Sequence, residues 1–156
     1  MAEYSANAVQ TVNPGETVVF TETYDGCERG FVRHRDGTGN FLLSGYVPNN
    51  GCRCRCCRDK SANYFVDFGA NIAVPTGETV GPISLAITVD GATVPATTMT
   101  VTPAAVEQFF NVSRASNVKI WRGCCETVSV RNTSAIPILV ENANIVFTRP
   151  DLNVTR

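Results

Sequence analysis

The sequence predicts an all-β protein, an antiparallel β-sandwich, on three observations. Short runs of β-branched and aromatic residues recur about every 10 residues, and each run ends at Gly, Pro, Asn or Asp. Apolar and polar side chains alternate within the runs, which gives each strand one face to bury. Apolar spacing of the helical kind is nearly absent. A sandwich or barrel of about nine or ten strands follows.

Turn residues separate the predicted strands. The strands cover residues 17–23, 30–35, 40–46, 61–73, 83–89, 93–102, 107–114, 117–121, 126–132 and 138–148. Two connections predict hairpins, Asp36-Gly37-Thr38-Gly39 and Asp90-Gly91, because glycine accepts the positive φ of a tight turn. Residues 103–110 (PAAVEQFF) would also permit two helical turns, which leaves the fold class unchanged.

The longest run, Ser61–Ala73, shows the alternation most clearly, with Tyr64 and Phe68 on one side and Phe65 on the other. In the first run Val18 and Phe20 share a face that we expect to be buried. The candidates for the core, or for an interface between copies of the chain, are aromatic: Tyr64, Phe65, Phe68, Phe109, Phe110 and Trp121.

A chain of 156 residues has the size of one domain with a full core. We expect the domain at residues 14–150, an N-terminal arm at 1–13 and a C-terminal tail at 151–156. Only 17% of the residues are charged and 44% are hydrophobic, which favours a surface made for contact with other chains.

The charge and the N-terminus exclude several partners. The net charge of -1 gives no overall attraction to nucleic acid or to an acidic membrane. Residues 1–14 lack the apolar stretch of an export signal, and no run is long enough for a membrane helix. We therefore expect synthesis in the cytoplasm without a signal peptide, and neither nucleic-acid nor membrane binding.

A modest basic patch lies between Cys27 and Lys60, where seven cationic residues meet three anionic ones. The cationic residues are Arg29, Arg33, Arg35, Arg53, Arg55, Arg58 and Lys60. One interpretation is a solvated loop face whose arginines bridge neighbouring loops or subunits. The alternative is a binding surface for an anionic polymer.

Seven cysteines form the least generic feature, and the segment GCRCRCCRDK holds four of them. They are Cys27, Cys52, Cys54, Cys56, Cys57, Cys124 and Cys125. Three hypotheses stay open: disulfides between the two cysteine-bearing loops, a zinc site, and free thiols whose thiolate form the neighbouring arginines favour. The spacing C-x-C-x-C-C does not match the usual zinc pairs, so no cofactor is expected, and an odd count leaves one sulfur for an interchain bond.

The order of the strands resembles the trimeric jelly rolls of tumour necrosis factor and complement-component type, in the bacterial form at the ends of exosporium collagen-like glycoproteins. The resemblance rests on PGETVVF (14–20), RDGTGNFLLSG (35–45), YFVDFGANI (64–72), GPISLAITVDGATVP (81–95), VSVRNTSAIPILV (128–140) and NANIVFTRP (142–150). The chain is also similar to small proteins encoded in phage and prophage regions of Gram-positive bacteria. It departs from the collagen-like proteins in lacking Gly-X-Y triplets and in carrying the cysteine segment. The resemblance implies a homotrimer.

Three functions are therefore weighed. The first is a homotrimeric structural or display protein on a phage virion, as a head decoration or fibre, or on a bacterial or spore surface, with capsid or other surface proteins as partners. The second is a module that binds a glycan or another host surface. The third is a metal-binding or redox protein that uses the cysteines. An enzyme is not expected, because no nucleophile and base stand in a suggestive context.

Overall fold

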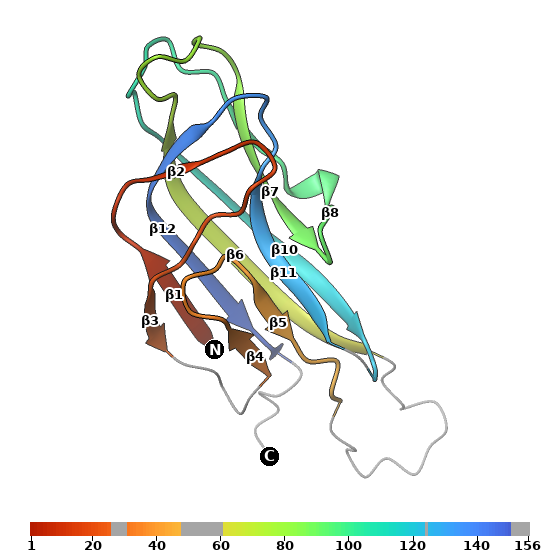
Figure 1. Cartoon of the computed structure of the whole chain (residues 1–156). Helices are drawn as coiled ribbons and strands as arrows, with labels where there is room; N and C mark the ends of the chain where they lie inside the picture. Colours follow the sequence, from red (N-terminus) through yellow and green to blue (C-terminus); the bar gives the residue numbers. More distant parts are fainter. Residues whose placement is uncertain (26–30, 48–60, 124, 151–156) are drawn as a thin grey trace, which may run out of the picture.

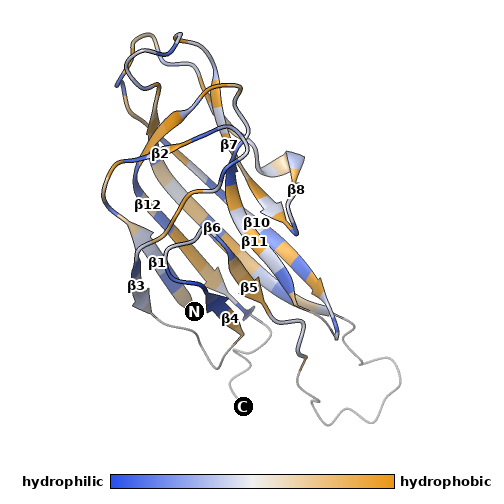
Figure 2. Cartoon of the chain, viewed as in Figure 1, coloured by the Kyte–Doolittle hydropathy of each residue, from blue (hydrophilic) through white to orange (hydrophobic). Residues whose placement is uncertain are grey.

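Alternating apolar side chains build two antiparallel sheets that face each other across one core (Figure 1). This computed structural model describes residues 1–25, 31–47, 61–123 and 125–150. Hydrophobic and hydrophilic residues alternate along the long strands, as the pattern predicts (Figure 2). The predicted fold class, an all-β antiparallel sandwich, is confirmed.

The first sheet has the strand order β10-β6-β12-β1-β3, and β2 pairs with the start of β12. Its strands are β1 (Ala2–Ala6), β2 (Gln10–Val12), β3 (Glu22–Asp25), β6 (Ser61–Ala73), β10 (Phe110–Trp121) and β12 (Ile138–Thr148). Every pairing is antiparallel, and β6 lies between β10 and β12 along most of its length.

The second sheet has the order β4-β5-β11-β7-β8, with β9 also paired to β7. Its strands are β4 (Val32–His34), β5 (Phe41–Leu43), β7 (Ile83–Val89), β8 (Ala92–Thr93), β9 (Met99–Val101) and β11 (Glu126–Asn132). The predicted hairpins at Asp36–Gly39 and Asp90-Gly91 are confirmed by the pairs β4–β5 and β7–β8.

Aromatic side chains from both sheets meet in the core. The ring of Phe41 in β5 lies 4.8 Å from that of Phe147 in β12 and 4.9 Å from that of Tyr4 in β1. Phe20 contacts Phe41 at 5.3 Å and is fully buried, as is Val18, in agreement with the predicted face of the first run. This cluster holds the two sheets together.

The structure differs from the predicted strands at several points. The run 93–102 is not one strand, because β8 ends at Thr93 and Pro95 starts a 3₁₀ turn before β9 begins at Met99. Residues 1–13, expected as an arm, supply β1 and β2, and β1 lies between β12 and β3. The run 17–23 is not one strand, because Thr17 makes an isolated bridge to Arg131 and β3 starts only at Glu22. The runs 107–114 and 117–121 join in one strand, β10, since no turn residue interrupts its pairing with β6.

Residues 103–110 form no helix, and Glu107 takes a positive φ of 56° there. In the described parts of the chain the single helical turn is the 3₁₀ segment Pro95–Thr97. No helix found there has the length and hydropathy that crossing a bilayer requires.

Candidate functional site

The outer face of the first sheet carries an aromatic side chain that the core leaves out. Phe65 of β6 is 40% exposed, whereas its neighbours Tyr64 and Val66 are buried. Phe65 stands opposite Asn117 of β10 and Thr148 of β12 in the strand register, so all three point away from the core. This surface, the outer face, offers apolar area without a covering layer in the single chain.

The edge strand β10 adds further exposed apolar groups at its two ends. Phe110 is 37% exposed at the start of the strand, and Trp121 is 57% exposed at its end. Lys119 places its Nζ 4.5 Å from the centre of the Trp121 ring, a cation–π contact. Arg114, which lies between Phe110 and Trp121 in the strand, is exposed as well. The predicted interface aromatics therefore divide between this edge and the outer face.

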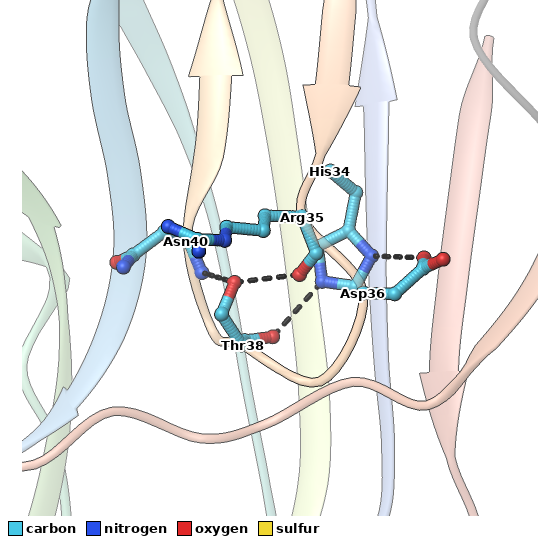
Figure 3. A network of polar contacts seen from close by, with 5 residues as sticks. All are labelled: His34, Arg35, Asp36, Thr38 and Asn40. Atoms are coloured by element: carbon cyan, nitrogen blue, oxygen red, sulfur yellow. Dashed lines mark hydrogen bonds and ion pairs between the residues drawn. The ribbon is translucent and has the colours of Figure 1, made fainter.

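The hairpin β4–β5 is closed by a compact polar network (Figure 3). Thr38 Oγ1 donates to the carbonyl oxygen of Arg35 at 2.7 Å, and the Asn40 amide donates to Thr38 Oγ1 at 3.3 Å. The Nε2 atom of His34 lies 2.9 Å from the carbonyl oxygen of Thr38, and because a carbonyl only accepts, Nε2 is the donor. The network fixes the turn between the two strands.

The His34 ring packs inward, and its stacking fixes which side of the β4–β5 hairpin faces the core. The ring stacks on Phe41 with centroids 4.6 Å apart and planes inclined by 21°. Because side chains alternate along a strand, the neighbouring Arg33 then points outward, opposite Leu42 of β5.

Two adjoining surface pockets lie at the end of the second sheet where β5 ends and β11 begins. The larger, of about 210 Å³, is lined by Ser44, Gly45, Tyr46, Val47, Arg122, Gly123 and Cys125. The smaller, of about 90 Å³, is lined by Arg33, Leu42, Ser44 and Cys125. Ser44 and Cys125 line both, so the two pockets adjoin, and together they are called the pocket pair.

A buried arginine braces the segment that lines the pocket pair. Arg149 is 4% exposed, and its Nη1 donates to the carbonyl oxygen of Tyr46 at 2.8 Å. Its guanidinium lies 4.7 Å from the centre of the Phe31 ring and 5.3 Å from that of Tyr64. The Tyr64 hydroxyl in turn donates to the carbonyl oxygen of Ser44 at 2.7 Å. Residues 44–47 are thus tied to the first sheet.

The structure places the aromatic candidates in three different settings. Tyr64 and Phe68 lie in the core, Phe109 is half-buried, and Phe65, Phe110 and Trp121 are exposed. Of the basic candidates, Arg33 lines the pocket pair and Arg35 is exposed on the adjacent turn. Arg29, Arg53, Arg55, Arg58 and Lys60 lie outside the described residues.

Of the seven cysteines only Cys125 is described, and its thiol is exposed and free. Cys27, Cys52, Cys54, Cys56, Cys57 and Cys124 lie outside the described residues, as do the disulfide and zinc hypotheses that depend on them. Where the structure is described, no three His, Cys, Asp or Glu side chains gather as metal ligands do.

Sequence reasoning missed Arg122, Ser44 and Tyr46 as lining residues of a pocket. Arg122 follows Trp121 and precedes a glycine and two cysteines, so its only local signal was a turn before the cysteine pair. Nothing along the chain relates it to Arg33, because the antiparallel pairing of β5 with β11 brings the two regions together.

The sequence matches no protein-family profile and no curated protein. Among solved structures, the globular domain of zebrafish complement 1qA protein aligns over 93% of this chain and 94% of its own, with a TM-score of 0.58 and 11% identity. Eiger TNF from S. frugiperda aligns over 95% and 90%, with a TM-score of 0.65 and 10% identity. At such identities the likeness concerns the fold, so the predicted resemblance to complement and tumour necrosis factor jelly rolls is confirmed at the level of fold.

Proposed function

We propose that this protein is a homotrimeric display module that works by assembly and attachment and not by catalysis. The observation that carries the proposal is the outer face, where Phe65 is left exposed while Tyr64, Val66 and Phe68 on the other side of the same strand are buried. Burial of apolar surface stabilises an interface by ~25 cal/mol per Å². A second copy would supply the covering layer that one chain lacks.

The exposed face and the exposed edge are two different surfaces of the chain, and this favours a ring of copies. Phe65 lies on the outer face, whereas Phe110 lies on the strand that forms the border of the sheet. An edge that packs on the face of the next copy makes a heterologous contact, and such contacts close into rings when the rotation permits. Three copies is the number that the resemblance to tumour necrosis factor jelly rolls implies.

Charge supports the same arrangement. On the outer face Asp67 is exposed, and the partly exposed Glu3 lies level with it, because both are paired with Val146 of β12. Glu141 is also partly exposed, beside Asn71 further along β6. Arg114 is exposed on the edge strand. An acidic face against a basic edge steers one copy onto the next and disfavours face-to-face pairing, because like charges repel.

The oligomer is tested by the mass of the native protein, measured by light scattering after size exclusion and by native mass spectrometry. We expect three times the 16.8 kDa mass of the chain. Phe65→Ser should give monomers that still fold, as judged by circular dichroism. Leu42→Ser is the matched control, since Leu42 is 37% exposed on the other sheet. A monomeric wild-type chain would overturn the proposal.

For location, we propose a phage virion, as a head decoration or fibre, or a bacterial or spore surface. The support is the resemblance expected from the sequence motifs alone, and no match to a curated protein adds to it. Antibody detection in purified particles and in cell-envelope fractions of the producing culture tests it. Protein confined to the cytosolic fraction would contradict this assignment and leave the trimer untouched.

A second candidate function, a binding module for a glycan or host surface, is favoured by the pocket pair. Its lining contains Arg33, one of the basic residues singled out for surface binding, together with the exposed ring of Tyr46. The two candidates are compatible at Arg33 and Leu42, which lie on the second sheet, whereas Phe65 lies on the outer face of the first.

A further inference from the structure

The described lining of the pocket pair offers hydrogen-bond donors. Arg33 lines one pocket and Arg122 the other, and among the described residues no aspartate or glutamate lines either pocket. Guanidinium groups only donate hydrogen bonds and stay charged. The lining is therefore suited to a group that is both anionic and rich in acceptors.

In the part of the chain that the structure describes, the fold uses neither guanidinium. Among the residues that the structure describes, Arg33 and Arg122 form no ion pair and no side-chain hydrogen bond. Two other arginines show the contrasting case, because Arg131 donates to the carbonyl oxygen of Gly91 at 2.9 Å and Arg149 to that of Tyr46 at 2.8 Å. The donors of the pocket pair remain available to a ligand.

Ser44 stands where the two pockets meet and completes the donor set. Its Oγ accepts a hydrogen bond from the Tyr46 amide at 3.2 Å, so its own hydrogen is left to donate. The main chain here is held from the first sheet. Tyr64 donates to the carbonyl oxygen of Ser44, and Arg149 donates to that of Tyr46. The shared wall is therefore fixed in place before any ligand arrives, which lowers the entropic cost of binding.

We propose that the pocket pair binds the carboxylate or sulfate group of an acidic saccharide, held by Arg33, Arg122 and the Ser44 hydroxyl. This inference rests on the second candidate function and names its ligand class. The sugar ring would pack on Tyr46, which is 59% exposed, and on Leu42 at the other side. Gly123 leaves room for close approach of a ligand to the main chain, because nothing lies within 4 Å of the place where a Cβ would stand.

The size and charge of the site favour a saccharide over a nucleic acid. At about 210 Å³ the larger pocket lies below the ~300–1,000 Å³ typical of drug-sized ligands, which suits one compact ring with its charged group. Binding of a nucleic-acid backbone relies on many phosphate contacts along a cationic surface, whereas two arginines stand among the described lining residues of the pocket pair.

The site also agrees with assembly. Arg33 and Leu42 lie on the outer side of the second sheet, away from the face that carries Phe65. A trimer would therefore present three copies of the pocket pair. Weak binding at each would add up on a surface with many acidic sugars, because linked sites raise the effective concentration.

The test uses the full chain with three tetrasaccharides: a sulfated heparin fragment, a galacturonic acid oligomer and a neutral maltotetraose. Isothermal titration calorimetry should detect one or both acidic probes, and not the neutral one. Binding should weaken as the salt concentration rises. The preferred probe distinguishes a sulfate site from a carboxylate site.

Variants locate the binding. Arg33→Gln and Arg122→Gln should each lower the affinity about tenfold, the loss expected for one charge-assisted hydrogen bond. Arg35→Gln is the matched control, because Arg35 is an exposed arginine on the same hairpin outside both pockets. Melting temperature and native mass should stay unchanged in all three.

Equal affinity for the neutral probe, unchanged binding in the double variant R33Q/R122Q, or equally tight binding of single-stranded DNA would each overturn the inference. A trimer that binds no acidic probe would refute the binding site and leave the proposed trimer standing. A monomer that binds in an Arg33- and Arg122-dependent way would refute the trimer and support the binding site.

Discussion

The hydroxyl of Tyr64 donates to the main-chain carbonyl of Ser44 across 2.7 Å, and this bond joins the longest strand of one sheet to the pocket wall of the other. Tyr64 is 1% exposed and Ser44 is half-buried, so the bond is partly shielded from water. Tyr64, a core residue, thus also positions Ser44, a candidate ligand-binding residue.

Tyr64→Phe should lower the free energy of unfolding by about 1–2 kcal/mol, because the Ser44 carbonyl loses a buried partner. For a domain of this size that corresponds to a fall in melting temperature of roughly 2–8 °C. Thermal unfolding followed by circular dichroism measures it. Tyr24→Phe is the control, since Tyr24 is 73% exposed. Equal melting temperatures for the two variants would contradict the assigned role.

Arg149→Met should cost about 2–4 kcal/mol, since it removes a charge-assisted hydrogen bond to Tyr46 and the stacking on Phe31 and Tyr64. Arg149→Lys keeps the charge and loses the planar guanidinium, so it should recover only part of the stability. Urea unfolding gives both values. The exposed Arg35, changed to Met, should leave stability unaltered; complete recovery by lysine would show that charge alone matters.

Asn132→Ala should destabilise the far end of the sandwich by about 2–4 kcal/mol. The buried amide donates from Nδ2 to the carbonyl oxygens of Val12 at 2.9 Å and Ile136 at 3.0 Å, and its Oδ1 accepts from the Ser134 amide at 2.8 Å. Three main-chain groups lose their partner together. Chemical unfolding tests this against Asn63→Ala, an exposed asparagine, and a loss no greater than that of the control would refute it.

Iodoacetamide should modify Cys125 in the native protein without denaturant or reductant, because this thiol is free and exposed. Peptide mass spectrometry identifies the site, and Cys125→Ser is the negative control. Repeating the count in denaturant, with and without reductant or chelator, decides among disulfide, zinc and free thiol for the other six cysteines. A Cys125 that reacts only after reduction would contradict the free thiol.

The strands that follow the alternating pattern most closely were predicted with their bounds. Ser61–Ala73, Ile83–Val89, Glu126–Asn132 and Ile138–Thr148 match the structure to the residue. Burial on one face is a local property, set by every second side chain, so it can be recognised without knowledge of the partner strand. Val18 and Phe20 show the same rule, since both are buried although their segment is not a regular strand.

The pairing of distant segments could not be predicted in this way. Ala2–Ala6 carries little β-forming sequence and becomes a strand because β12 and β3 supply its hydrogen-bond partners on both sides. The same holds for the join of 107–114 with 117–121, which the continuous partner β6 imposes. Tertiary context outweighs local preference at these positions.

By itself the sequence determined the all-β class, the resemblance to complement and tumour necrosis factor jelly rolls, and the basic residue Arg33 as a binding candidate. Only the tertiary structure left Phe65 uncovered on one sheet and brought Arg122 beside Ser44 and Cys125 on the other. The physical reason is that the alternation of buried and exposed side chains along a strand depends on neighbouring residues. A surface or a pocket is formed by segments that meet only when the whole chain packs.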